Sequence, residues 1–185
     1  MKYVRLMDGT ISNESGLNTP IDEVVIARDW DPHATNRDDI KEINFSTDES
    51  ILRWIRRGDT LYDVIIPSDA EEKQVPGNFT PKGLFRTNNL ILTNPQKLIQ
   101  ELVLDLNYKM DLPERTIPDV LALLAIRGFT KAADKLIEEK ININNIDIFI
   151  EYYNQFENDI YDNNYGLYFE YKDKLLELRN KLINY

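Results

Sequence analysis

Residues 44–95 read NFSTDESILRWIRRGDTLYDVIIPSDAEEKQVPGNFTPKGLFRTNNLILTNP, and this stretch decides the fold. Its first part has the pattern of a capped helix. Ser46 lies three residues before Glu49, as in a capping box, and arginines fill the last turn before Gly58, which suits a left-handed C-cap. We therefore expect a helix from about residue 46 to 57, buried through three apolar side chains, namely Ile51, Leu52 and Ile55.

Apolar, β-branched runs on both sides of this helix predict strands. Residues 60–66 (TLYDVII) end at Pro67 and are apolar enough for a central strand. Residues 84–93 (LFRTNNLILT) contain two adjacent asparagines, which indicate a bulge or an edge position. Residues 2–7 (KYVRLM) and 23–30 (EVVIARDW) are further candidates, and the VVIA run of the second predicts burial on both faces.

After residue 94 the apolar pattern changes to a helical period. Asn94-Pro95 predicts a helix start, Pro118 and Gly128 mark the two ends of a second helix, and Thr130 opens a third. Further helices are expected over about 146–153 and 167–183. The predicted fold class is α+β. A small mixed or antiparallel sheet domain with one well-capped helix occupies residues 1–94, and an all-α C-terminal module of about five helices, packed on it, occupies residues 95–185.

The last predicted helix places Tyr168, Leu175 and Leu182 seven residues apart, with Tyr171 and Leu178 beside them. Such a series is typical either of a stripe that packs in the core or of a seam that binds a partner helix. Both interpretations are open from the sequence.

Charge and composition narrow the classes of function. The chain has 185 residues, a formal net charge of -10 and no cysteine. An acidic surface repels phosphate, so direct nucleic-acid binding is disfavoured, whereas a basic protein partner suits it. The lack of cysteine excludes disulfides, cysteine zinc sites and thiol nucleophiles. No apolar run is long enough for a signal peptide or a membrane span, so we expect a cytoplasmic protein that does not bind membranes.

The single histidine lies in a polar segment with two aspartates. Asp29, Asp31 and His33 occupy alternate positions, so an extended backbone would place them on one side, as in a metal site. Pro32 interrupts the segment, and its composition is typical of a solvated turn. We expect the turn and no bound metal.

The N-terminal half resembles the ADP-ribosyltransferase-like superfamily. The resemblance rests on a strand that carries Arg5, then Phe-Ser-Thr at 45–47, then a strand that ends in Ile-Pro at 66–67. In that family an arginine or histidine on the first strand and an aromatic-Ser-Thr-Ser element line a cleft that binds NAD. The resemblance implies that Arg5 takes the first role and that Ser46 and Thr47 take the second.

The sequence departs from the family pattern at two points. Asp48 stands where the second serine is expected. The family also has a catalytic glutamate on a later strand, whereas residues 84–91 read LFRTNNLI and contain no acid. The nearest acids, Glu71 and Glu72, lie in the preceding loop.

The most unusual composition is the tyrosine-rich, acidic region 150–171. Tyrosine is enriched at protein interfaces because it combines a large rigid ring with a hydroxyl. The candidate partner-binding residues are Tyr152, Tyr153, Glu157, Asp159, Tyr161, Asp162 and Tyr165. The alternative is a pair of helices with tyrosines half-buried at its rim.

These observations favour a non-catalytic, acidic interaction or regulatory protein that binds a protein partner and needs no cofactor. One concrete form is an inhibitor of a basic, nucleic-acid-binding host factor, of the phage or mobile-element type. The alternative is an NAD-dependent ADP-ribosyltransferase-like enzyme or a degenerate NAD-binding domain.

Overall fold

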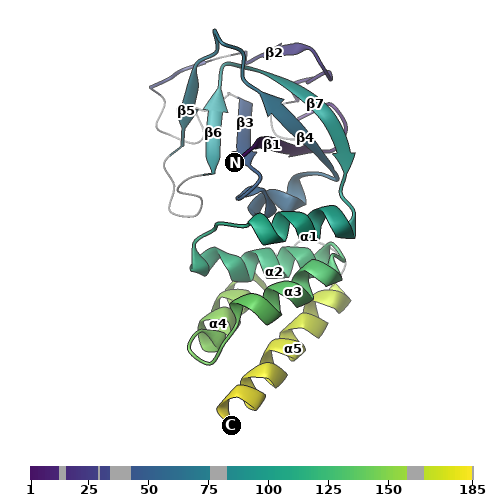
Figure 1. Cartoon of the computed structure of the whole chain (residues 1–185), viewed down its shortest axis with the longest axis vertical. Coiled ribbons are helices and arrows are strands. Elements are labelled where there is room, and N and C mark those ends of the chain that lie inside the picture. The colour runs from purple at the N-terminus through teal and green to yellow at the C-terminus, as the bar shows by residue number, and fades with distance from the viewer. Residues whose placement is uncertain (13–15, 29, 34–42, 76–82, 158–164, 185) are drawn as a thin grey trace. The chain divides into compact units, whose positions relative to one another are not determined.

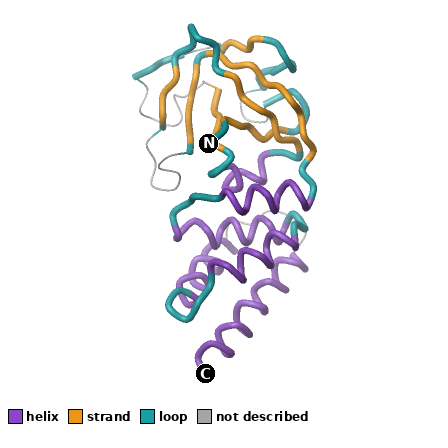
Figure 2. Tube along the Cα trace, in the orientation of Figure 1, coloured by secondary structure: helices purple, strands orange, loops and turns teal. Residues whose placement is uncertain are grey.

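The computed structural model describes residues 1–12, 16–28, 30–33, 43–75, 83–157 and 165–184. The chain forms two compact units. One comprises Met1–Leu98 with Lys109–Asp111, and the other comprises Ile99–Tyr108 with Leu112–Tyr185. Within the described residues the first unit contains an antiparallel sheet and the second contains α-helices (Figures 1 and 2). The predicted α+β class is confirmed.

The first unit is built on a seven-stranded sheet. Its strands are β1 (Tyr3–Met7), β2 (Val24–Ile26), β3 (Ile43–Thr47), β4 (Thr60–Ile65), β5 (Glu72–Gln74), β6 (Leu84–Thr87) and β7 (Asn89–Lys97). The spatial order is β2-β7-β4-β1-β3-β6-β5, and all named neighbours pair antiparallel. As predicted, the run that ends at Pro67 forms a central strand, β4, between β7 and β1.

Strands β6 and β7 are consecutive in the chain but lie near opposite ends of this strand order. Only Asn88 separates β6 from β7, yet β6 pairs with β3 and β5 whereas β7 pairs with β4 and β2. A sheet can place consecutive residues near both of its ends only if it curls around. The strand segment 84–97 therefore folds the sheet around its own core (Figure 1).

That core fills the concave face of the curled sheet. Its fully buried residues are Met7, Val25, Ala27, Ile43, Phe45, Tyr62, Val64, Phe85, Leu90 and Leu92. Phe45 and Phe85 stack with ring centroids 5.4 Å apart, and the half-buried Tyr3 packs edge-on against Phe45 at 4.9 Å. Because alternate residues of a strand share a face, these side chains come from alternate positions of neighbouring strands.

The second unit is arranged around a helix that is apolar on all sides. Its helices are α1 (Gln100–Lys109), α2 (Ile117–Ile126), α3 (Thr130–Lys140), α4 (Ile146–Glu157) and α5 (Tyr165–Ile183), with a short 3₁₀ turn, η3 (Glu114–Thr116), before α2. All of α2 is buried except Asp119, and α2 packs against α3, α4 and α5. The two residues predicted to mark the ends of this helix are confirmed. Pro118 lies in the first turn, and Gly128, at a φ of 74°, follows the end of the helix.

The prediction that Ser46 caps the first turn of a helix is wrong. Ser46 and Thr47 instead end β3, and the helical segment is the 3₁₀ helix η2 (Ile51–Arg57). Its N-cap, Ser50, makes no side-chain capping bond. Pairing of β3 with both β1 and β6 places Phe45 in the core, and this long-range gain outweighs a local cap of about 1 kcal/mol.

Gly58 also acts differently from the prediction. Its φ of 175° is extended rather than left-handed. A Cβ at this position would lie 2.1 Å from the carbonyl carbon of Met7. Glycine is therefore needed at position 58 because two backbones approach closely there. The predicted buried side of the segment is confirmed, since Ile51, Leu52 and Ile55 are all at most 2% exposed.

Two other segments differ from the prediction. Strand β2 covers only three residues, and Val24 and Ile26 are 55% and 68% exposed, so burial on both faces is wrong. Asn94-Pro95 does not open a helix. Asn94 takes a positive φ of 51°, the register of β4 against β7 shifts there, and β7 continues to Lys97. The segment is a bulge, where the missing N–H of proline is tolerated.

We expect truncation of the buried face of η2 to be costly and truncation of its exposed side to be cheap. Leu52→Ala should lower the free energy of unfolding by about 2–5 kcal/mol, because it removes a side chain that is 1% exposed and leaves a cavity. Arg56→Ala, at an exposed position in the last turn, should cost less than about 1 kcal/mol. Urea unfolding followed by tryptophan fluorescence measures both. The reverse order would mean that η2 presents its other side to the sheet.

Candidate functional site

The strand register separates the residues that the family resemblance brings together. In the pair formed by β1 and β3, Val4 lies opposite Ser46 and Tyr3 lies opposite Thr47. Directly opposed residues share a face of the sheet, and alternate residues of a strand share one as well. Arg5 therefore lies on the face of Tyr3 and Thr47, and Ser46 lies on the other.

The two hydroxyl residues are enclosed by the chain itself. Ser46 is 2% exposed and Thr47 is 1% exposed, and the Ser46 hydroxyl donates a hydrogen bond to the carbonyl oxygen of Gly83. A Cβ on Gly83 would lie 2.1 Å from Ser50 Oγ and 3.4 Å from Thr47 Oγ1. The hydroxyls are thus packed around a glycine backbone, and this arrangement leaves them no access to a ligand.

The two acids nearest in sequence to the expected catalytic glutamate have other partners. Glu71 accepts a hydrogen bond from Trp30 Nε1 at 2.5 Å, and Glu72 accepts one from the Tyr3 hydroxyl at 2.9 Å. Burial, together with the hydrogen bond and the charge of Glu72, raises the pKa of Tyr3 to about 12. Neither glutamate bonds to Ser46 in the described part of the chain. Arg5 Nη2 lies 3.3 Å from Ser12 Oγ.

The histidine segment forms a local turn at the surface. The backbone N–H of His33 donates to Asp31 Oδ1 at 2.8 Å, and both residues are exposed. Asp29 lies outside the described residues. Among the residues that the structure describes, no three histidine or acidic side chains are placed to hold a metal ion together.

Tyr153 is a core residue of the helical unit. Its ring stacks on that of Tyr168 with centroids 4.6 Å apart and planes at 3°, and both residues are 0% exposed. Each hydroxyl donates to the backbone carbonyl of the other residue, at 2.8 and 2.9 Å. The prediction that Tyr153 contacts a partner is therefore wrong. Both buried hydroxyls therefore have a hydrogen-bond acceptor within the helical unit.

The other members of the tyrosine-rich region are only partly described. Tyr152 is half-buried on α4. Glu157 ends α4 and Tyr165 begins α5, so both belong to helices. Asp159, Tyr161 and Asp162 lie outside the described residues.

Tyr171 links α5 to α3 through its hydroxyl. The hydroxyl of Tyr171 lies 2.9 Å from Asp134 Oδ1 and 3.1 Å from the carbonyl oxygen of Thr130. The ammonium group of Lys174 lies 4.3 Å from the centre of the Tyr171 ring. Burial and the carboxylate of Asp134 raise the pKa of Tyr171 well above its usual range.

Helix α5 has a second apolar row beside the buried one. Tyr168, Tyr171 and Leu175 are at most 1% exposed and form the core side of the helix. One position further along the chain, three large apolar side chains spaced seven residues apart remain accessible. They are Phe169 at 44%, Leu176 at 41% and Ile183 at 51%, and we call them the outer stripe. Its seven-residue spacing is visible in the sequence but is hidden there beside the stronger Tyr168, Leu175 and Leu182 series.

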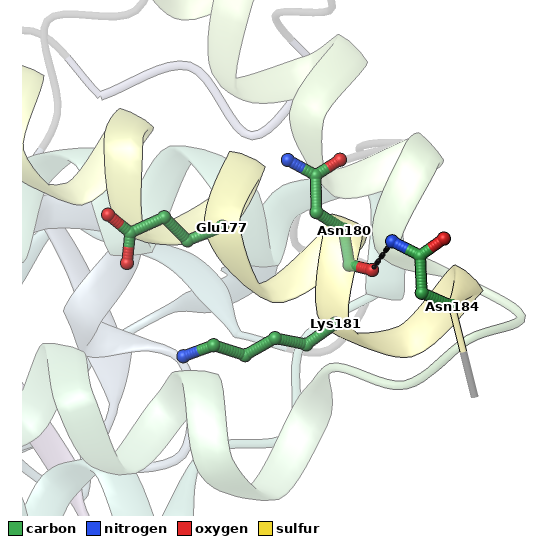
Figure 3. Close-up of a pocket in the computed structure, with 4 residues that line it drawn as sticks. All are labelled: Glu177, Asn180, Lys181 and Asn184. Carbon is green, nitrogen blue, oxygen red and sulfur yellow. Dashed lines mark hydrogen bonds between the residues drawn. The ribbon is translucent and has the colours of Figure 1, made fainter.

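The end of α5 also carries a surface depression lined by Glu177, Asn180, Lys181 and Asn184 (Figure 3). The Asn184 amide donates to the backbone carbonyl of Asn180 at 2.8 Å. The side chains of Glu177 and Lys181 do not converge on a common point in this view. Three of the four residues lie on α5 and Asn184 directly follows it, so the depression lacks the enclosing walls of a small-molecule site.

No family model, curated protein or solved structure matches this chain.

None of the helices in the described ranges combines the length and the apolar composition needed to cross a bilayer.

We expect the paired tyrosine hydroxyls to stabilise the helical unit. Tyr153→Phe or Tyr168→Phe keeps the stacked rings but removes one buried hydrogen bond, and should cost about 1 kcal/mol. Tyr108→Phe is the matched control, because Tyr108 is 60% exposed and should change stability by less than about 0.5 kcal/mol. Urea unfolding followed by helical circular dichroism measures all three. Equal stability of the three variants would contradict the assigned role of the pair.

Proposed function

We propose that this chain is a non-catalytic, acidic protein-interaction module that binds a basic protein partner through α5. The observation that carries the proposal is the outer stripe. Phe169, Leu176 and Ile183 remain 41–51% exposed on a helix whose other apolar side is already packed. The apolar arc of α5 is wider than its own unit covers, as expected for a helix that has a second partner.

The accessible area of the outer stripe limits the binding free energy that apolar contact alone can provide. Covering roughly 80 Å² more on each of three side chains would release about 6 kcal/mol at about 25 cal/mol per Å². Association itself costs on the order of 4–15 kcal/mol. Apolar contact alone therefore gives little net affinity, and charge complementarity has to supply the rest.

Two acidic side chains beside the outer stripe favour a basic partner surface. Asp173 and Glu177 are exposed and lie on the flank of the stripe away from the core. On the opposite flank lie two cations, the half-buried Lys172 and Arg179, and Arg179 is bound to Asp147 at 2.5 Å. The chain as a whole carries a net charge of -10, which attracts a basic protein at long range. An inhibitor of a basic, nucleic-acid-binding protein is one form of this function.

The alternative function, an NAD-consuming transferase, receives no support from the site. Arg5 and Ser46 occupy opposite faces of the sheet, and Ser46 already bonds Gly83. We therefore expect NAD not to bind. A protein that did bind NAD would gain about 2.7 kcal/mol of stability at a hundred times the dissociation constant, which a thermal-shift measurement detects readily.

A capture experiment with matched baits tests the proposed function. Wild-type protein, Leu176→Glu and the control Lys181→Gln are immobilised and exposed to lysate of the native cells at low and high salt. We expect the wild type and the control to retain the same basic protein at low salt. Leu176→Glu should lose it because the substitution places a charge in the centre of the stripe. High salt should release the captured protein from the wild type, because salt screens the attraction between the two charged surfaces.

Two outcomes would contradict the proposal. One is equal capture by wild type and Leu176→Glu. The other is a retained partner that is acidic or insensitive to salt. Circular dichroism of each bait confirms that loss of capture is not loss of folding.

A further inference from the structure

Strand β2 (Val24–Ile26) ends the sheet with an open hydrogen-bonding edge. The N–H of Ala27 donates to the carbonyl oxygen of Asn88 at 2.7 Å, so residue 27 turns its backbone groups toward the β6–β7 strand. These groups alternate along an antiparallel strand. Val25 therefore also bonds inward, and the N–H and C=O groups of Val24 and Ile26 point away from β7. In the described part of the chain, no strand pairs with that side of β2.

The outer face beside this edge is apolar. Val24 lies opposite Ile91 of β7, and Ile91 lies opposite Ile65 of β4, so the three side chains form a row across three strands. Val24 is 55% exposed, Ile65 is 50% exposed, and Ile26, next on the same face, is 68% exposed. Natural edges are commonly protected by short strands, lysine, proline or a bulge, and β2 is short but contains no lysine, proline or bulge.

We propose that β2 pairs antiparallel with β2 of a second copy of this chain, around a two-fold axis through Val25. In this register Val24 lies opposite Ile26 of the partner subunit, and the same contact repeats on the other side of the axis. The outward backbone groups of these residues then form about four hydrogen bonds. The apolar rows of the two copies join into one continuous band.

Charge complementarity selects a second copy as the occupant. With Val25 on the axis, the segment before β2 of one subunit, which carries the acids Asp22 and Glu23, lies beside the segment after β2 of the partner subunit, which carries Arg28, and this contact occurs twice. All three charged residues are exposed. A chain with a net charge of -10 repels its own copies, so opposite charges at both ends of the contact offset part of that repulsion. The surface is distinct from the outer stripe of α5, so this inference does not depend on the proposed function.

Amide hydrogen exchange over a concentration series tests the pairing. The experiment uses the full-length chain, with residue-specific exchange followed by nuclear magnetic resonance and mass followed by sedimentation. We expect the Val24 and Ile26 amides to exchange fast when the chain is dilute and to become protected as a dimer forms. The Val25 amide is the internal control, because its bond to the neighbouring strand protects it at every concentration.

Three outcomes would overturn the proposal. The chain could remain monomeric throughout. It could dimerise while Val24 and Ile26 still exchange fast, which would place the interface elsewhere. The two amides could also be protected at every concentration, which would mean that the chain itself covers this edge.

Charge variants provide a second, independent test. Arg28→Glu places a third acid beside the acids before β2 of the partner subunit and should weaken dimerisation at least about tenfold, whereas Arg28→Lys should change it less than about threefold. Arg56→Glu makes the same change of charge at an exposed position of η2 and should behave like Arg28→Lys. Equal dimerisation of Arg28→Glu and Arg56→Glu would overturn the proposed register. Protection of the Val25 amide shows that each variant is folded.

Discussion

The hydrogen bonds at Thr87 and Asn88 hold the corner on which the curled sheet depends. Thr87 is 0% exposed, and its hydroxyl lies 2.8 Å from the carbonyl oxygens of both Glu71 and Asn89. The hydroxyl has one hydrogen, so it donates to one of them, and it also accepts from the Asn89 N–H at 3.3 Å. The Asn88 side chain accepts from the Glu71 N–H at 2.8 Å, and the backbone carbonyl of Asn88 accepts from the Ala27 N–H at 2.7 Å. This corner therefore joins β6, β7, the start of β5 and the end of β2.

The architecture of the first unit follows from this corner. Because β6 and β7 turn there, one strand segment covers both ends of the strand order, and Phe85, Leu90 and Leu92 face the same interior. The same register places Arg5 and Ser46 on opposite faces. A short sequence likeness to an NAD-binding family therefore does not gather the family's groups in one place. The fold leaves apolar surface accessible on α5 and beside β2, and these are the two surfaces on which the proposals rest.

Local signals predicted the helical half well and the sheet only in part. Pro118, Gly128 and the 3.6-residue period lie within single segments, so they fix helix limits without knowledge of the rest of the fold. Strand β3 was missed because Phe-Ser-Thr followed by an acid is also a helix-start pattern, and only pairing with β1 and β6 decides between the two. The prediction of a helix start at Asn94-Pro95 failed for the same reason, since the same residues are also typical of a bulge.

The candidate site shows the same limit. The sequence located the tyrosine-rich region but could not predict that Tyr153 and Tyr168 satisfy each other's hydroxyls and carbonyls in the core. That pairing needs the geometry of two helices. The outer stripe was predictable in principle from its spacing, but which of two adjacent seven-residue series is buried depends on the helices that pack against α5.

The stability of Thr87→Val tests most directly whether the corner holds the sheet together. The substitution keeps the shape of the side chain and removes only its hydrogen bonds. Thr93→Val, on the same strand segment at a half-buried position, is the control. We predict that Thr87→Val lowers the free energy of unfolding by about 1–3 kcal/mol, because it removes the donated and the accepted hydrogen bond of a buried hydroxyl, while Thr93→Val changes it by less than about 0.5 kcal/mol. Equal stability of the two variants in urea unfolding would contradict the account.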